Sequence, residues 1–557
     1  MNLRLTKAPG TASPLHVRFT PASPESNPRL VRKTFLQTIL AVAISVLAPI
    51  VAHAGSATWD LNPGSGTWNT AVNWTPITIP NGPADTATFA LSNTTNVSIS
   101  ANTEVNGITF TPAATNPYTI TARAAFTLRI TGTGITNNSG RTQHFISPVG
   151  ANGEFGLIVF SNSATAGNST MFTNNGAFLN GEVRGGTRFL DTSSAGNGTF
   201  INNGGFTEFS DSSTAGNGSF TNNGGTVSGA GGGRAIFQQT SVADSATLIA
   251  NGGTGGGQGG QILFEDASTG GTSRVEVFGN GNLDISSHNA PGVAVGSIEG
   301  SGNAFLGGNN LSVGTNNLST TFSGVIQDGG RSGGVGGSLT KIGTGTLILS
   351  GANTYTGNTN INRGVLRVDG SITSDTSVHY TGTLAGTGMI HGNVMNNDFG
   401  IVRPGGALGT PGVLTVVQNY TQTQYATLMI QIAGGNAGQF SVLDVMGNAN
   451  LNGYLDPVLL SGFVPNIGDS FIFLNYASLT GGFSHIKHQV FDNGLLQWSV
   501  IYQNNSAILT VVPNTIPDQG STLLLLTLGL LALVTYRRQL STGIGCARRR
   551  KCPLIRK

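Results

Sequence analysis

Polar side chains recur at one position of a repeat in the middle of the chain, two residues after a phenylalanine. They are Asn162, Asp191, Asp211, Gln239 and Asp266. Carboxylates stacked at the spacing of neighbouring strands, about 5 Å, repel each other unless they are protonated or bridged by a cation, and calcium would be the hard cation of choice. The alternative is that Asp and Asn side chains cap the turn that follows. Because Asn and Gln interrupt the carboxylates, we favour turn capping and expect no metal and no cofactor.

Two further motifs have the residue types of known sites but lack the elements that would position them. Gly330-Arg331-Ser332-Gly333-Gly334 matches the G-x-S-x-G turn of serine hydrolases, which needs a strand before it and a helix after it. Here more glycine follows the motif. His485 and His488 form H-x-x-H without a third ligand at helical spacing, so we interpret them as surface histidines. We therefore predict no catalytic residue and no metal ligand.

Short β-strands are the elements that position these side chains. A column of phenylalanines, with spacings of 29, 20, 28 and 27 residues, runs Phe160, Phe189, Phe209, Phe237, Phe264. Such spacings are typical of β-helix turns that carry loops of different length, and Asn-Gly pairs accept the positive φ needed at corners. We predict one core-facing column of rings in a continuous solenoid over residues 90–510.

The stretch 338–370 reads SLTKIGTGTLILSGANTYTGNTNINRGVLRVDG. Its runs at 347–349, 359–361 and 365–368 are separated by Gly, Asn and Thr, which predicts strand, turn, strand, turn, strand. The stretch resembles the passenger-associated transport repeat, or autotransporter-associated β-strand repeat, of bacterial surface proteins. The resemblance implies an exported, right-handed parallel β-helix and supplies no chemical activity.

The N-terminal region has the three parts of a signal peptide. Basic residues at 29, 32 and 33 precede an apolar run over 35–50, and Ala52-His53-Ala54 follows. Small residues at −3 and −1 predict cleavage before Gly55, after export by the Sec machinery. The alternative is an N-terminal membrane anchor.

Three of the four tryptophans, Trp59, Trp68 and Trp74, fall near the start of the mature chain. A solenoid needs a cap over its first rung, because an open end exposes strand edges and core. We predict that the tryptophans form this cap. The alternative is a platform on which carbohydrate stacks.

A short proline motif, an apolar run and a basic pair follow one another near the C-terminus. The motif is Ile516-Pro517-Asp518-Gln519-Gly520, the run is 523–534, and the pair is Arg537-Arg538. This order resembles the PEP-CTERM class of sorting signals in its Val-Pro-Asp-Ser-Gly variant, from which Ile516 and Gln519 depart. The resemblance implies an exosortase-type sorting enzyme as partner. We predict a single transmembrane helix stopped by Arg537 and Arg538. It is marginal, because even the 16 residues from Ser521 to Tyr536 span only about 24 Å of a roughly 30 Å hydrocarbon core.

Charge is concentrated at the two ends of the chain. Residues 55–536 hold 13 basic and 23 acidic groups, a net of −10, and no basic stripe, so a nucleic-acid partner is excluded. Both cysteines, Cys546 and Cys552, lie in the basic tail, so no disulfide stabilises the middle of the chain.

These patterns define an all-β chain with a signal helix at its start and a membrane helix at its end. The expected segments are signal peptide 1–54, Trp-rich cap 55–89, irregular β-helix 90–337, repeat 338–370, C-terminal rungs 371–512, sorting signal 513–538 and basic cytoplasmic tail 539–557.

We expect a non-enzymatic surface or extracellular-matrix protein with a structural or adhesive role, attached to the membrane at least transiently. Extracellular polysaccharide is the candidate ligand. The alternatives are a polysaccharide-active lyase or hydrolase and an adhesin that binds glycans. Such enzymes need carboxylates clustered with Arg or Lys in a groove, and 13 basic residues scattered over 482 positions argue against them.

Overall fold

The computed structural model describes residues 55–176, 184–514 and 519–543. All of them belong to the second of two compact units, residues 54–557. The predicted signal peptide, with Ala52 and Ala54, lies outside the described residues, and so do Ile516, Pro517 and Asp518 of the sorting motif.

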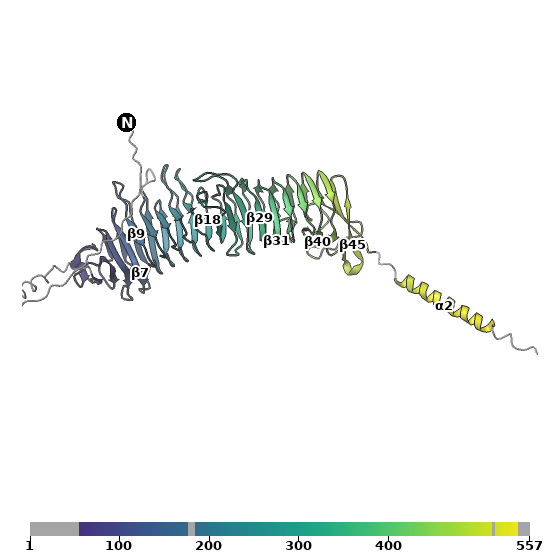
Figure 1. The fold of residues 1–557 in the computed structure, drawn as a ribbon, viewed down its shortest axis with the longest axis horizontal. Coiled ribbons are helices and arrows are strands. Elements are labelled where there is room, and N and C mark those ends of the chain that lie inside the picture. Colours follow the sequence, from purple (N-terminus) through teal and green to yellow (C-terminus); the bar gives the residue numbers. More distant parts are fainter. Residues whose placement is uncertain (1–54, 177–183, 515–518, 544–557) are drawn as a thin grey trace, which may run out of the picture. The chain divides into compact units, whose positions relative to one another are not determined.

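Parallel strands from successive turns of the chain stack side by side in long sheets (Figure 1). Sheet 1 has 13 strands, of which only the first pair, β1 with β2, is antiparallel. At about 4.8 Å between strands, this sheet extends for about 60 Å. In spatial order its strands are β2 (Trp74–Thr75), β1 (Ala57–Trp59), β3 (Gly82–Phe89), β5 (Thr103–Phe110), β7 (Thr127–Asn137), β9 (Leu157–Phe160), β11 (Gly186–Phe189), β13 (Phe206–Phe209), β15 (Arg234–Phe237), β17 (Gln261–Phe264), β19 (Asn282–Asp284), β22 (Asn303–Phe305) and β25 (Val325–Gln327).

Sheet 2 takes one or two strands from each turn, all of them parallel. In chain order they are β4 (Asn96–Ile99), β6 (Thr119–Ala122), β8 (Gln143–Ser147), β10 (Thr170–Asn175), β12 (Thr199–Asn203), β14 (Ser219–Asn223), β16 (Thr247–Ala250), β18 (Arg274–Val277), β20 (Gly292–Val295), β21 (Ser297–Gly300), β23 (Asn310–Val313), β24 (Thr320–Phe322), β26 (Ser338–Lys341), β27 (Thr346–Leu349), β29 (Thr359–Val368), β31 (Thr376–Gly386), β33 (Val394–Asn396), β34 (Ile401–Pro404), β36 (Tyr420–Gln422), β37 (Thr427–Ile432), β39 (Asn448–Leu451), β40 (Tyr454–Leu459), β42 (Ser478–Gly481) and β43 (His485–Ile486).

Sheet 3 lies in the C-terminal half of the coil, and its last strands pair antiparallel instead of parallel. Its nine strands, in spatial order, are β28 (Ala352–Asn353), β30 (Ser371–Ile372), β32 (Met389–Ile390), β35 (Val413–Val416), β38 (Val442–Val445), β41 (Ser470–Asn475), β46 (Ser506–Pro513), β45 (Leu496–Tyr502) and β44 (Val490–Phe491). The pairs up to β38–β41 are parallel, whereas β41–β46, β46–β45 and β45–β44 are antiparallel. This antiparallel end, which the sequence did not indicate, lies over the last rungs with Trp498 buried against Phe491.

Alternating burial explains why these short segments are strands. In β15 and β16, half-buried and buried side chains alternate, and the inward positions hold Ala235, Phe237, Leu248 and Ala250. One turn cannot bury such a face by itself, so each turn is stabilised by the turns on either side. The predicted all-β fold with parallel sheets, as in a β-helix, is therefore confirmed.

The predicted phenylalanine column is also confirmed. Phe160, Phe189, Phe209, Phe237 and Phe264 pair in register along sheet 1 and are fully buried. Their ring centroids are 4.8, 4.8, 4.9 and 4.9 Å apart, with planes within 14° of parallel. This spacing equals the distance between strands, so each turn adds one ring to the same stack.

The transport-repeat stretch differs from its prediction at one corner. Separate strands were expected at 359–361 and 365–368, but both belong to β29. The register of β29 against β31 shifts between Ile361 and Arg363, and Gly364 has a φ of 69°. A bulge therefore bends one continuous strand where a turn was predicted.

The tryptophans form the core of the N-terminal cap. Trp59, Trp68 and Trp74 are buried, and Trp74 meets the other two edge-on at 5.0 and 4.9 Å between ring centroids. Each indole N–H donates to a backbone carbonyl. No ring face is open to a sugar, so the alternative of a carbohydrate platform at these residues is wrong.

Helix α2 (Gln519–Gly543) is longer at both ends than the apolar run 523–534. It begins within the sorting motif, at Gln519 and Gly520, and contains Arg537 and Arg538, both exposed. Within the described residues, no helix has the combination of length and apolar character that crossing a membrane requires. The predicted transmembrane helix is therefore not supported, because polar residues share α2 with the short apolar run.

Candidate functional site

The repeated polar column lies on the turns that follow the strands of sheet 1. Its five members are exposed, and their φ angles lie between 54° and 57°. This left-handed conformation is tolerated best by Gly, Asn and Asp, which explains the residue types at most rungs. The members are Asn162, Asp191, Asp211, Gln239 and Asp266.

Four side chains of this column accept a backbone N–H from the turn one rung earlier, whereas Asn162 Nδ2 donates to the carbonyl of Thr131 at 2.8 Å. Asp191 Oδ2 accepts a hydrogen bond from the backbone N–H of Asn162 at 2.8 Å, and Asp211 Oδ2 accepts one from Asp191 at 2.9 Å. Gln239 accepts from the N–H of Asp211, and Asp266 from that of Gln239 at 3.0 Å. The interpretation as turn caps is correct, but the donor belongs to the preceding rung rather than to the turn that follows.

These hydrogen bonds stabilise the carboxylates without a cation, because one oxygen of each, Oδ2, accepts a backbone N–H. In the part of the chain that the structure describes, no group of three or more His, Cys, Asp or Glu residues could hold a metal ion. The column is thus a device that holds successive turns together.

The Asn-Asn-Gly repeats form a second set of polar contacts, a ladder of hydrogen bonds inside the coil. The buried amides of Asn174, Asn202 and Asn222 form a ladder, with Nδ2 to Oδ1 distances of 2.8 Å at both steps. Thr207 donates to Asn202 at 3.0 Å and accepts from Asn174 at 3.2 Å. Buried amides that are fully bonded in this way fix the register of the rungs.

The G-x-S-x-G motif is part of a loop between β25 and β26. The element after it is a strand, so the strand-to-helix turn of a nucleophilic serine does not form here. Ser332 Oγ lies 2.6 Å from Ser287 Oγ, and its N–H donates to Ser286 Oγ at 2.9 Å. The motif anchors a loop.

The two histidines of the H-x-x-H motif are exposed, as predicted. His488 Nδ1 lies 3.2 Å from Asp456 Oδ1, and the His485 ring packs at 5.6 Å from the ring of Tyr454. Their partners are thus different residues, and nothing in this arrangement brings the two imidazoles to one ligand.

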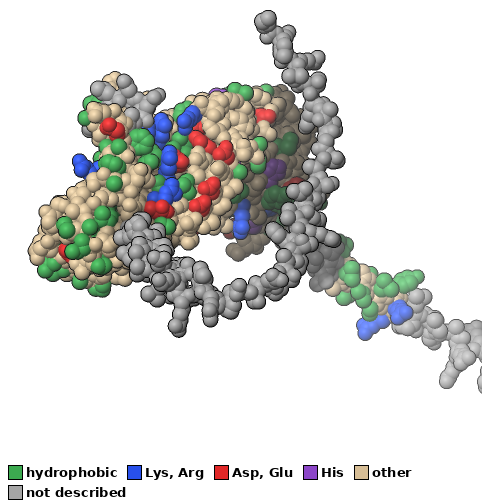
Figure 2. All heavy atoms as spheres, turned by 60° about the vertical axis from the view of Figure 1, so that its left-hand side comes forward, with side chains coloured by type: hydrophobic (Ala, Val, Ile, Leu, Met, Phe, Trp, Pro, Cys, Tyr) green, Lys and Arg blue, Asp and Glu red, His purple; other side chains and the backbone are tan. Residues whose placement is uncertain are grey.

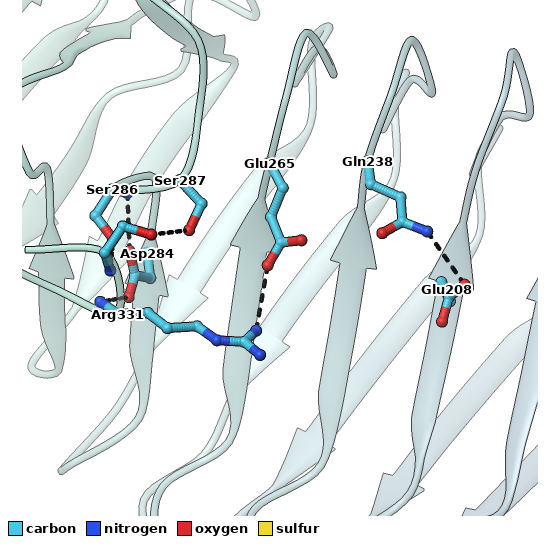
Figure 3. A network of polar contacts seen from close by, with 8 residues as sticks. Glu208, Gln238, Glu265, Asp284, Ser286, Ser287 and Arg331 are labelled. Atoms are coloured by element: carbon cyan, nitrogen blue, oxygen red, sulfur yellow. Dashed lines mark hydrogen bonds and ion pairs between the residues drawn. The ribbon is translucent and has the colours of Figure 1, made fainter. Parts of the chain in front are cut away.

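Charged side chains gather on one face of the molecule, beside a mostly uncharged surface (Figure 2). Arg188 Nε of β11 lies 3.4 Å from Glu208 Oε2 of β13, and Gln238 donates to Glu208 at 3.2 Å. Arg331 Nη1 lies 3.2 Å from Glu265 Oε1 (Figure 3). The expectation that basic residues are scattered is therefore wrong for this face.

The Gly-rich loop 328–337 completes this charged face by folding back over earlier turns. Asp284 accepts from the backbone N–H groups of both Arg331 and Ser286, each at 2.8 Å, and so holds the loop to β19 (Figure 3). Arg331 and Glu265 are 66 residues apart in the sequence. Spacing along the chain gave no signal for this pair.

Partial burial shifts the pKa values of several of these groups. Burial raises the pKa of Glu265, against the lowering effect of Arg331, and nearby carboxylates raise it further. Burial and the charges of Arg234 and Arg331 lower the pKa of Arg184 to about 10. Burial and Arg331 likewise lower the pKa of Arg234, whose Nε is buried without a hydrogen-bond partner. A carboxyl group of raised pKa among guanidinium groups could bind an anion or move a proton.

A neutral groove of about 860 Å³ follows the Asn-Gly corners of the same turns. Its lining consists of amides, backbone and small apolar side chains, among them Asn175, Asn203, Asn223, Val149 and Ala230. Groups of this kind offer hydrogen bonds but no acid, base or nucleophile.

Lys341 of the transport-repeat stretch is a buried cation at 1% exposure. Its ammonium donates to the carbonyl oxygens of Ile342, Gly343 and Arg363, the last two at 3.1 and 3.3 Å. Burial lowers the pKa of Lys341 to about 8. The side chain ties β26 to the corner of β29, where Arg363 lies.

Comparison with protein families gives two matches. The family of the passenger-associated-transport-repeat matches residues 339–368, and the VPDSG-CTERM motif matches residues 516–540. The two resemblances noted in the sequence are therefore confirmed, and they fall on separate segments of the chain.

Similarity to individual proteins is local. An extracellular serine protease of Serratia marcescens is 46% identical over 78 residues, which are 14% of this chain and 7% of that protein. The adhesin BmaC autotransporter of Brucella suis biovar 1 (strain 1330) is 36% identical over 110 residues, 19% of this chain and 3% of that protein. The matches thus span less than a tenth of the length of either relative. The chain is an exported cell-surface protein with a passenger-associated transport repeat and a C-terminal VPDSG-CTERM sorting motif.

Proposed function

We propose that this exported surface protein is a non-enzymatic structural or adhesive component of the cell surface or extracellular matrix. The observation that carries the proposal is that the side chains of the repeated polar column bond to the backbone of neighbouring turns. Its carboxylates accept backbone hydrogen bonds of the neighbouring rung, so the residues with the most regular spacing serve the scaffold. The local similarity to an autotransporter adhesin supports the same function.

Export and processing complete the proposal. The Sec machinery exports the chain, cleavage before Gly55 releases the mature N-terminus, and an exosortase-type enzyme acts on the motif Ile516 to Gly520. The VPDSG-CTERM match supports this sorting step. Because α2 includes Gln519 and Gly520, part of the motif on which the enzyme would act is helical.

The test compares cells that produce the full chain with cells that lack it. We expect antibody labelling and external protease to reach the protein on intact cells, and attachment or matrix retention to fall when it is lost. Equal attachment by the two strains, with the protein present at the surface, would reject the adhesive and structural role.

A polysaccharide-active enzyme remains the second candidate, because Glu265 and Arg331 lie together on the charged face. Glu265 would supply the proton-transferring carboxyl group, and Arg331 would bind an acidic sugar. The purified protein should then release reducing sugars or unsaturated products from a polysaccharide, and Glu265→Gln should abolish this release. Arg274→Gln is the matched control, since Arg274 is 47% exposed and pairs with different carboxylates, Glu276 at 3.2 Å and Glu299.

A further inference from the structure

Three arginines come together on the charged face. Arg184 lies just before β11, Arg234 begins β15, and Arg331 reaches Glu265 from the Gly-rich loop. Besides the larger effect of burial, the charges of Arg234 and Arg331 lower the pKa of Arg184, and the charge of Arg331 lowers the pKa of Arg234. The three guanidinium groups are therefore close enough to repel one another. We name Arg184, Arg234 and Arg331 the arginine cluster.

Two members of the arginine cluster have no carboxylate partner among the described residues. Arg331 pairs with Glu265 at 3.2 Å, but no described carboxylate forms an ion pair with Arg184 or Arg234. The Nε of Arg234 is buried and has no hydrogen-bond partner. A cation that is removed from water without an opposite charge destabilises the fold. An anion bound at the cluster would remove this cost.

The neutral groove of about 860 Å³ runs beside the arginine cluster. Arg184 pairs with Gly176 in an antiparallel bridge, and its Nη1 donates to the carbonyl of Gly204 at 2.7 Å; both glycines line the groove. Nη1 also donates to Gly232 at 2.8 Å, which brings the guanidinium to the rung of Arg234. The volume is within the range of ligand-binding clefts, about 300–1,000 Å³, and a cation lies at the edge of the groove.

Amides repeat along the groove at the spacing of the rungs. Asn223 Nδ2 donates to Asn203 Oδ1 at 2.8 Å, and Asn203 Nδ2 donates to Asn175 Oδ1 at 3.4 Å. An amide has two N–H donors and two oxygen lone pairs, so Asn203 keeps one of each for a ligand. Sugar hydroxyl groups both donate and accept, and one pyranose is about as long as the ~4.8 Å between rungs. Successive amides therefore suit successive sugars of one extended chain.

We propose that this edge of the coil binds an acidic polysaccharide, with its carboxylates on Arg184 and Arg234 and its hydroxyl groups in the groove. A polymer of uronic acids carries both kinds of group on every sugar, whereas a neutral polymer leaves the guanidinium groups unpaired. Guanidinium and carboxylate groups match in geometry and form paired hydrogen bonds.

Distant charges oppose this binding only weakly. Salt at physiological strength screens exposed charges beyond about 8 Å, so the net charge of −10 over residues 55–536 has little effect at the cluster. The binding involves no reaction and does not depend on the second, enzymatic candidate. It deepens the proposed adhesive function and rests on that function for its biological setting.

The test uses the purified full chain in gels that contain sodium alginate, with hydroxyethyl cellulose as the neutral comparison and a chelator to remove calcium. We expect retardation by alginate alone, and a roughly tenfold rise in Kd for Arg234→Met. Arg363→Met is the matched control, because Arg363 is exposed, carries the same charge and lies in β29 of sheet 2. Its Kd should not change.

Thermal melting separates binding from folding. Because the buried Nε of Arg234 has no partner, Arg234→Met should melt at the temperature of the unaltered protein or above it. Alginate should raise the melting temperature of the unaltered protein more than that of the variant. Unchanged affinity in Arg234→Met, a clearly lower melting temperature of this variant or equal retardation by hydroxyethyl cellulose would each overturn the proposal.

Failure of the site and failure of the proposed function give different results. If Arg234→Met loses alginate binding but cells with and without the protein attach equally, the proposed function fails and the site stands. If attachment depends on the protein but Arg234→Met binds alginate as tightly as the unaltered chain, the site fails and the proposed function stands.

Discussion

The buried ammonium of Lys341 makes the stability of the transport-repeat stretch depend on pH. The unfolded chain holds this proton up to a pKa of 10.5, whereas the folded chain releases it at about 8. Between these values the unfolded state binds more protons, so the free energy of unfolding rises as the pH rises. The whole shift corresponds to about 3 kcal/mol, and about 2 kcal/mol of it falls between pH 8 and pH 10.

Hydrogen exchange measures this effect locally, which suits a solenoid whose rungs open separately. After correction for the intrinsic pH dependence of exchange, peptides covering 338–349 should gain about 2 kcal/mol of opening free energy between pH 8 and pH 10. The window ends at pH 10 because burial raises the pKa of Tyr355 to about 12, and this group lowers stability at higher pH. In Lys341→Met the gain should disappear.

Lys487→Met is the matched control, since the side chain of Lys487 is 39% exposed. This variant should retain the pH dependence at residues 338–349. An equal slope in Lys341→Met and the unaltered protein, or a fall in stability between pH 8 and pH 10, would refute the assignment of the buried cation.

Four further outcomes are expected. Phe209→Ala should cost about 3–5 kcal/mol in local opening free energy, because its ring stacks between two others, and Phe209→Leu should cost clearly less. Asp211→Ala should lose about 2 kcal/mol and Asp211→Gly about 1, since both lose a hydrogen bond but only alanine is strained at a φ of 56°; thermal melting that ranks alanine above glycine would contradict this. Chelators should leave the melting temperature unchanged, and a large drop would revive a calcium-bound column. Mass spectrometry of surface protein should find a C-terminus near Ile516 to Gly520, without Cys546, and a peptide that includes Arg537 would reject sorting.

Regular repeats made much of the fold predictable. The spacing between Phe189 and Phe209 equals the length of one turn of the coil. Rings at equivalent positions of successive turns stack, so this spacing was enough to predict the column. The same spacing revealed the polar column, but not the direction of its hydrogen bonds. That direction depends on which neighbouring backbone N–H the side chain faces, which the residue type alone does not specify.

Other features depend on contacts between unlike rungs. Phe399 and Tyr425, whose exposed rings stack at 5.4 Å, are separated by 26 residues in dissimilar segments, so no repeat marks them as a pair. Arg331 reaches Glu265 only because a loop turns back across sheet 1. The buried tryptophans were predicted as a cap from their position, since an aromatic cluster at the start of a coil has a core to cover.

The hydrogen bonds of the polar column give the growth of the coil a direction. Asn162 obtains its acceptor from Asp191 and Asp191 from Asp211, so each turn is completed by material that comes later in the chain. In a chain that emerges N-terminus first, the most recently folded turn would therefore lack the hydrogen bond from the next rung. Each new turn would supply this bond to the turn before it and would itself have an unpaired backbone N–H. An edge with unpaired groups is a template for any extended chain, including another copy. The column ends at Asp266, and much farther along the chain the antiparallel strands β44–β46 pair with β41 and with one another, so the parallel stacking of sheet 3 ends there.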